Sequence, residues 1–190
     1  MKHRIFFLTA LLILLLCLSA AADTGITPVS EYISKDTDEL PDVLNIGVTL
    51  RCGDLQIMLM GQPVLTKSNL GMIAELDMNY LTIRLGFTNT SDKTVGWLMP
   101  DSFLVQETWN HRIYGAYRLD PIISAKVAAG FKLPVFFTPI EPGKTLQTPL
   151  VFSVYPGAQS WILSFSPRMI GEEAPNAETV RFQLPAAITQ

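Results

Sequence analysis

Apolar and polar residues alternate with a period of two along most of this chain from about residue 43 onward. In residues 80–87, large apolar side chains occupy one parity and smaller or polar side chains occupy the other. The first set is Leu81, Ile83, Leu85 and Phe87, and the second is Thr82, Arg84 and Gly86. This alternation predicts a strand in a sheet that has one solvent-exposed face.

Further segments with strand character follow along the chain, separated by turn residues. They are residues 44–52, 55–59, 102–109, 112–119, 150–155, 160–166 and 180–184. The breaks between them include Gly53-Asp54, Asn89–Lys93, Glu141–Lys144 and Pro156-Gly157. Such short strands, with no long helical pattern, predict an all-β domain, an antiparallel β-sandwich of about seven to nine strands.

Residues 120–140 follow the alternation least clearly. Residues 124–130 predict one or two helical turns, with Ser124 as the N-cap and Gly130 as the stop. Residues 133–140 are apolar but contain Pro134 and Pro139, which favours an edge strand over a central strand.

The first 22 residues have the pattern of a secretory signal peptide. A short basic start precedes an apolar run from Ile5 to Leu18, and Ala20-Ala21-Ala22 then offers a small-residue cleavage site before Asp23. Two alternatives stay open. The run is close to the length of an uncleaved membrane anchor, and Cys17 is a candidate for lipid attachment, although Leu16 before it is larger than the usual residue.

Residues 23–42 have no periodic pattern and include acidic positions, which predicts a linker or arm ahead of a domain over residues 43–190. Removing residues 1–22 takes away Lys2 and Arg4, so the net charge changes from −3 to −5. No cluster of basic residues is present, and the sequence therefore predicts no nucleic-acid partner. Contact with a membrane is expected only if the signal is not cleaved.

Cys52 is the one cysteine that remains after residue 22, so no internal disulfide is available to the domain. It shares its parity with Leu44, Ile46, Val48 and Leu50, which predicts a buried thiol. An exposed thiol that pairs with a partner is the alternative.

Three landmarks occur in a fixed order. Residues 80–92 form a strand that runs into Asn-Thr-Ser-Asp, residues 100–105 read Pro-Asp-Ser-Phe-Leu-Val and precede a hairpin with Tyr114, and residues 140–143 read Ile-Glu-Pro-Gly before strands at 150–154 and 161–165. In this order they resemble a family of immunoglobulin-like domains of unknown function in exported bacterial proteins, over about residues 43–185.

The resemblance implies an immunoglobulin-like β-sandwich outside the cytoplasm, and it brings no catalytic residues. This chain departs from the family's pattern by about two dozen additional residues between Tyr114 and Ile140, within residues 116–140. Location outside the cell or in the cell envelope is expected, and in the periplasm if the organism has an outer membrane.

The sequence contains no recognisable motif for a set of catalytic residues. Ser124, His111 and Asp120 supply the residue types of a hydrolase triad, but no nucleophile-elbow motif surrounds Ser124. A pair of carboxylates for glycoside hydrolysis is brought together by the fold and leaves no local pattern in the sequence. Glu75 and Asp77, as i and i+2 on a strand, are expected simply to share an exposed face. The sequence predicts a protein that is not an enzyme.

No cofactor or metal site is predicted either. Gly143-Lys144-Thr145 looks like the end of a phosphate-binding loop, but Thr138 stands where the first glycine of that motif belongs. The acidic residues Asp36, Asp38, Glu39 and Asp42 lack the spacing of a calcium loop.

Aromatic residues near predicted turns are the remaining candidates for a functional surface. Trp97, Trp109, Tyr114 and Tyr117 are the candidate interface residues, whereas Trp161 shares the parity of the core residues Leu163 and Phe165. The favoured hypothesis is a non-catalytic exported module that binds a protein or an envelope component. An extracytoplasmic carrier or sensor for a small molecule or ion is the alternative, and an unrecognised hydrolase is a third.

Overall fold

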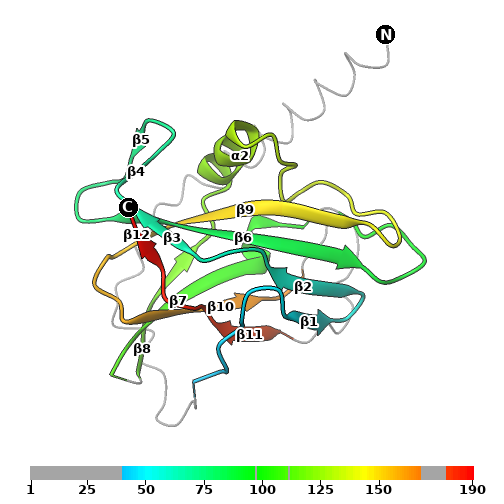
Figure 1. The fold of residues 1–190 in the computed structure, drawn as a ribbon, viewed down its shortest axis with the longest axis horizontal. Coiled ribbons are helices and arrows are strands. Elements are labelled where there is room, and N and C mark those ends of the chain that lie inside the picture. Colours follow the sequence, from blue (N-terminus) through cyan, green and yellow to red (C-terminus); the bar gives the residue numbers. More distant parts are fainter. Residues whose placement is uncertain (1–39, 97, 111, 168–178) are drawn as a thin grey trace. The chain divides into compact units, whose positions relative to one another are not determined.

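Two β-sheets pack against each other in this chain, as Figure 1 shows for the computed structural model. The structure describes residues 40–96, 98–110, 112–167 and 179–190, and all of these belong to the compact unit Tyr32–Gln190. Within these ranges no helix has the length and apolar character needed to span a bilayer. The predicted signal peptide lies outside the described residues.

The larger sheet has six strands, with β6 at its centre. β9 pairs along one side of β6, and β2 and β3 pair in succession along the other. Its strands are β1 (Thr49–Cys52), β2 (Leu55–Leu59), β3 (Val64–Thr66), β6 (Asn79–Asn89), β9 (Thr145–Val154) and β12 (Ile188–Thr189).

The smaller sheet has four strands in the order β11-β10-β7-β8, and every pairing in it is antiparallel. Its strands are β7 (Phe103–Trp109), β8 (Arg112–Arg118), β10 (Ser160–Phe165) and β11 (Val180–Gln183). A separate hairpin joins β4 (Ser68–Asn69) to β5 (Met72–Ile73), and a short 3-10 helix, η2 (Pro100–Ser102), precedes β7.

The core lies between the two sheets and is rich in phenylalanine. Phe87 of β6 lies with its ring centroid 5.8 Å from that of Phe103 and 5.4 Å from that of Phe165 in the opposite sheet. The apolar set of β6 predicted from alternation is completely buried. The predicted β-sandwich is therefore confirmed, and its antiparallel strands follow the period-two pattern.

The predicted helix is present but begins earlier than expected. α2 spans Pro121–Gly130, and Asp120 is its N-cap because its carboxylate accepts a hydrogen bond from the backbone N–H of Ile123 at 2.9 Å. The prediction of Ser124 as the cap is wrong. Pro121 suits the first helical position, where no N–H is required, and this moves the start upstream.

The other face of β6 is less exposed than alternation predicts. α2 covers one end of this face, where Tyr80, Val127 and Val151 form a second small core with Ala74. Gly86, predicted on the solvent-exposed side, is buried with Met60 packed over it. Of the predicted polar set, Arg84 is exposed, Thr82 is half-buried and Gly86 is buried.

Two predicted strands are wrong in extent. Residues 44–50 do not form one strand, because a turn at Ile46-Gly47, with Gly47 at φ +81, breaks the alternation and leaves Ile46 and Val48 exposed. β9 begins at Thr145 instead of residue 150. Pro149 is tolerated because β9 is an edge strand, and an imide nitrogen that faces away from β6 removes no bond of the ladder.

Residues 133–140 form no strand, which corrects the edge-strand prediction. The N–H of Leu133 bonds to the Ala128 carbonyl at the end of α2, and only Ile140 bridges to Val95. The segment still contributes to the core, because Phe136 is buried and its ring contacts that of Phe103 edge-on at 6.1 Å. Residues 116–140 thus add a helix outside the sheet and an aromatic ring inside the core.

Cys52 is only 3% exposed, as the favoured prediction required. The surface access that an exposed, partner-binding thiol needs is missing. The parity argument behind the prediction holds only from β1 onward, because the turn at Gly47 separates Cys52 from Leu44.

Ser124 provides a test of how α2 is attached to the sheet. Its side chain is 1% exposed, and its hydroxyl oxygen accepts a hydrogen bond from the Val151 N–H of β9 at 2.9 Å. We expect Ser124→Ala to lower the free energy of unfolding by about 2 kcal/mol, since it leaves a buried N–H without an acceptor. Chemical denaturation measures this change.

Thr148 supplies the matched control. It is equally buried, but its hydroxyl has no hydrogen-bond partner among the described residues. Thr148→Val removes an uncompensated polar atom, so we expect stability to be unchanged or to rise. An equal loss of stability in both variants would show that the Ser124 hydroxyl does not hold α2 in place.

Candidate functional site

Exposed aromatic side chains gather at one end of the sandwich, where β7 turns into β8 and β9 leads into β10. Trp109 is 48% exposed and Tyr114 41% exposed, and Tyr155, just after β9, is also exposed. We call Trp109, Tyr114, Tyr117 and Tyr155 the aromatic end. Three of these residues come from the single β7–β8 hairpin.

A β-bulge in this hairpin arranges the aromatic residues around one carboxylate. The register between β7 and β8 shifts at Gln106/Glu107, so that Glu107 lies opposite Tyr114 and Gly115 is the additional residue. Gly115 has φ +30, and a Cβ at this position would lie 3.2 Å from both Glu107 Oε1 and the Tyr117 hydroxyl. A side chain at this position would be strained by the positive φ and would crowd the Glu107 and Tyr117 side chains, so glycine is favoured here.

Tyr117 is held in place by this carboxylate. Its hydroxyl donates a hydrogen bond to Glu107 Oε2 at 2.7 Å, and its ring packs edge-on against Tyr155 with centroids 6.3 Å apart. Burial and the bond to Glu107 raise the pKa of Tyr117 above its ordinary value. The phenol consequently stays protonated and remains a donor throughout the physiological pH range.

The two loops at this end are joined by hydrogen bonds. The N–H of Gln159 bonds to the Thr108 carbonyl at 3.0 Å, and the Gln159 side-chain oxygen accepts from the Asn110 N–H at 2.9 Å. Asn110 lies in the left-handed region at φ +49, which asparagine tolerates better than most residues. The hairpin tip and the β9–β10 turn therefore form one connected surface.

The structure places the predicted interface residues unequally. Trp109 and Tyr114 are exposed, as an interface needs, whereas Tyr117 is half-buried and supports its neighbours. Trp97 lies outside the described residues. Trp161 is 5% exposed and belongs to the core, as predicted. Their role in an interface stays a prediction.

Glu107 is the residue of this site that sequence reasoning missed. It lies between two other polar residues in β7, so no local pattern distinguishes it. Its position opposite Tyr114 depends on the bulge at Gly115. The one signal available in the sequence was Gly115, two residues before Tyr117, because an isolated glycine in a strand often marks a bulge.

The residue types considered for catalysis have structural roles in the described part of the chain. Ser124 is buried and hydrogen-bonded to β9, and Asp120 caps α2. His111 lies outside the described residues. Glu75 and Asp77 lie in the loop between β5 and β6 and not on a strand, with Asp77 at φ +62, so the shared strand face predicted for them is wrong.

Residues considered for phosphate and metal binding are likewise explained by local structure. Residues 141–144 form the predicted turn, in which the Lys144 N–H bonds to the Glu141 carbonyl and Gly143 has φ +70. Asp36, Asp38 and Glu39 lie outside the described residues. Among the residues the structure does describe, no three His, Cys, Asp or Glu side chains form a metal-binding group.

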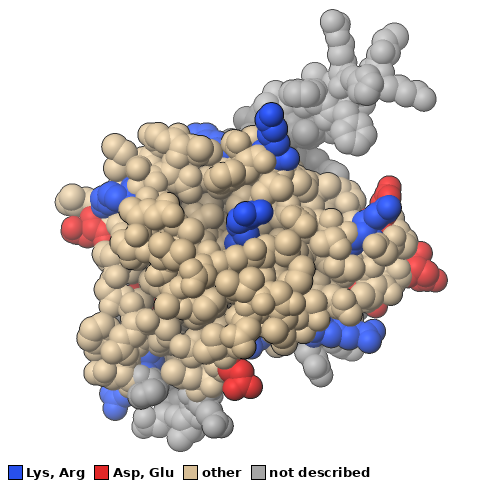
Figure 2. All heavy atoms as spheres, in the orientation of Figure 1, with Lys and Arg blue, Asp and Glu red and all other residues tan. Residues whose placement is uncertain are grey.

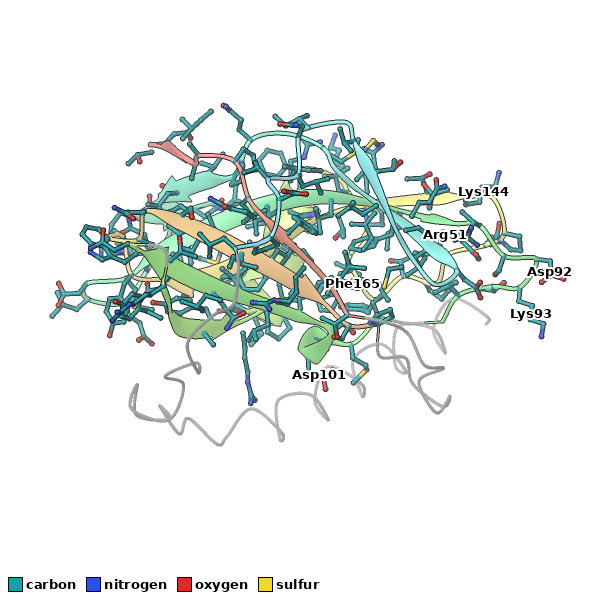
Figure 3. The ribbon with its side chains drawn as sticks, turned by 90° about the horizontal axis from the view of Figure 1, so that it is seen from below. Arg51, Asp92, Lys93, Asp101, Lys144 and Phe165 are labelled. Atoms are coloured by element: carbon teal, nitrogen blue, oxygen red, sulfur yellow. The ribbon has the colours of Figure 1, made fainter. Side chains whose placement is uncertain are left out.

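Charged side chains are distributed differently from the aromatic ones. On the face drawn in Figure 2, Lys and Arg are scattered and form no continuous basic stripe. Figure 3 shows Arg51, Asp92, Lys93 and Lys144 together at one end of the sandwich. This is the end of β6 opposite the aromatic end, because Asn89 lies beside Lys144 whereas Asn79 pairs with Val154.

No family model matches this sequence, and no curated protein matches it. Membership in the family of immunoglobulin-like domains suggested by the sequence therefore stays a prediction.

Solved structures of several bacterial proteins are similar to this chain. A β-sandwich protein from Clostridium difficile 630 is 15% identical over 80% of this chain and 99% of its own, with a TM-score of 0.44. The yjhA protein of Bacillus subtilis is 13% identical over 76% and 99% of the two chains, with a TM-score of 0.49.

The ycdA protein of Bacillus subtilis is 18% identical over 70% of this chain, with a TM-score of 0.46, and the matched region spans 37% of that longer protein. All three TM-scores lie below 0.5. These similarities accordingly carry no argument about function.

Proposed function

We propose that this chain is an exported, non-catalytic module that binds a protein or another component of the cell envelope through its aromatic end. It would act outside the cell or in the envelope, since the first 22 residues predict export. The observation that carries the proposal is the exposure of Trp109 and Tyr114 on one hairpin beside Tyr155.

Aromatic side chains of this kind are the usual anchors of protein interfaces. Tyr and Trp bury a large area with only two side-chain torsions each, and they are enriched among the residues that dominate binding energy. Here the bulge at Gly115 and the hydrogen bond from Tyr117 to Glu107 fix the support beneath them. A prearranged surface loses less conformational entropy on binding than a mobile one.

A non-catalytic role is supported by the positions of the candidate catalytic residues. The Ser124 hydroxyl is buried and already hydrogen-bonded, so it is inaccessible to a substrate. Asp120 is engaged by the first turn of α2. The hydroxyl and carboxylate of the one triad that the sequence offers are thus used for folding.

The test is affinity capture from the envelope and secreted fractions of the source organism, with the full chain as bait. We expect a component that is retained by the wild-type chain and lost with Trp109→Ala/Tyr114→Ala. Loss of two anchors, each worth about 1 kcal/mol or more, should weaken the measured Kd at least about 30-fold. Circular dichroism and a thermal melt check that the variant is folded.

Lys144→Ala is the matched control, because Lys144 is exposed at the opposite end of the sandwich (Figure 3). It should retain the component as well as the wild type does. Equal retention by the folded aromatic variant, or no retained component with the wild-type chain, would reject the proposal.

A further inference from the structure

The four most exposed large apolar side chains of the described residues lie in the β4–β5 hairpin, in the loop after it and at the end of α2, and none of them belongs to the aromatic end. They are Leu76 at 88%, Ile73 at 74%, Phe131 at 61% and Leu70 at 55%. The first, second and fourth lie in or just after the β4–β5 hairpin, and Phe131 immediately follows α2. We call these four residues the apolar tip.

Contact between the hairpin and α2 brings the four residues together. Leu70 lies against the end of α2, since its Cδ1 is 2.5 Å from where a Cβ on Gly130 would be. Phe131 is the next residue after Gly130. In Figure 1 the hairpin and α2 stand side by side above the larger sheet. The apolar tip is therefore a projection formed by two elements.

The backbone beneath the apolar tip is firmly attached. The Lys67 ammonium donates to the Glu75 carbonyl at 2.9 Å and to the Met78 carbonyl at 2.8 Å, and these bonds hold the loop that carries Leu76. The Tyr80 hydroxyl donates to the Ile73 carbonyl at 3.3 Å. The apolar side chains are thus exposed on an anchored loop.

The turn of the hairpin has an unusual residue in it. Leu70 and Gly71 are its two central residues, with φ of +47 and +77. The left-handed region suits asparagine or glycine at the first of these positions and is costly for a bulky side chain. Leu70 accepts this strain while its side chain packs against Gly130 of α2.

Charged residues around the apolar tip are mixed in sign. Lys132 follows Phe131, and Lys126 is exposed one helical turn after Ile122 on the same stripe of α2. Glu75 and Asp77 flank Leu76. On the face in Figure 2, basic and acidic side chains both lie over the region of the hairpin and α2. Lys67 is held by two carbonyls, whereas Lys126 and Lys132 are exposed cations on and just after α2.

We propose that the apolar tip inserts into the interfacial layer of an anionic lipid bilayer, with Lys126 and Lys132 near the lipid phosphates. Separate apolar side chains on a projection match a fluid surface, which needs no complementary groove. Lysines beside them supply the electrostatic attraction that such contacts use. This contact uses different residues from the aromatic end and is independent of the proposed function.

The test places a nitrobenzoxadiazole label at Leu76→Cys in the full chain carrying Cys17→Ser, bound to vesicles of phosphatidylcholine and phosphatidylglycerol. We expect the label to be shielded from aqueous iodide and quenched by lipid-borne nitroxide. The same label at Asp92→Cys, at the far end of β6, should stay accessible to iodide. Adding Ile73→Ser/Phe131→Ser should lower the shielded fraction at position 76 about tenfold.

Two further outcomes decide the proposal. Lys126→Glu/Lys132→Glu should reduce shielding on these vesicles and change little on pure phosphatidylcholine. A label at position 76 that stays accessible on vesicle-bound protein would overturn the proposal. So would shielding that increases with protein concentration in the absence of vesicles, because it would identify a second copy of the chain as the occupant.

Discussion

Phe103→Ala should lower the free energy of unfolding by about 4 kcal/mol, the usual result of removing a buried phenylalanine ring. Phe103 is 1% exposed and contacts the rings of Phe87, Phe136 and Phe165, with centroids 5.8, 6.1 and 5.2 Å away. Its ring joins both sheets and the segment after α2. A cavity there removes contacts on three sides at once.

The measurement is urea denaturation followed by tryptophan fluorescence, with the slope m compared between proteins. Phe131→Ala is the matched control, since the same atoms are removed from a side chain that is 61% exposed. It should change stability by less than about 0.5 kcal/mol. Similar losses in the two variants would contradict the position of Phe103 at the centre of the core.

Asn89→Ala should cost about 3 kcal/mol, the second-largest expected effect. The fully buried Asn89 amide donates to the Lys93 carbonyl at 2.7 Å and the Ile140 carbonyl at 2.8 Å. Its side-chain oxygen accepts from both the N–H and the hydroxyl of Ser91, at 2.9 and 2.8 Å. Alanine leaves these groups without their partner, and an unmet buried group costs about 1–3 kcal/mol.

Asn45→Ala serves as the control, because Asn45 is exposed and should tolerate the change. Asn89→Asp preserves the side-chain shape but replaces the NH2 group, which donates to two carbonyl oxygens, by a carboxylate oxygen that can only accept. We expect it to be at least as destabilising as alanine at neutral pH. Thermal unfolding of all three variants decides the matter, and wild-type stability in Asn89→Asp would show that the amide bonds are unimportant.

The sequence predicts the central strands well because their side chains alternate without interruption. β6, β7 and β10 begin and end within a few residues of the predicted ranges. Alternation fails where one residue changes direction or pairing. Gly47 introduces a turn inside an apparently continuous strand. Pro149 made the first half of β9 look unlike a strand in the sequence, yet this half pairs with β6 because an edge strand accepts proline.

The candidate site was only partly predictable. Trp109 and Tyr114 were accessible to sequence reasoning because aromatic residues beside a turn are easily recognised. Glu107 was not, since its place beneath Tyr114 and Tyr117 follows from a register shift that no local pattern encodes. The apolar tip was missed for a similar reason. Its residues come together through the packing of the β4–β5 hairpin on α2, which no local pattern reveals.

The most direct test of the proposed function is photo-crosslinking from Tyr114 in cells that produce the full chain. A benzophenone side chain at position 114 should give a discrete crosslinked product, which decreases when Trp109→Ala is added. The same group at position 92, at the end of the sandwich opposite the aromatic end (Figure 3), should give none of this product. Absence of a product from position 114, or the same product from position 92, would contradict recognition through the aromatic end.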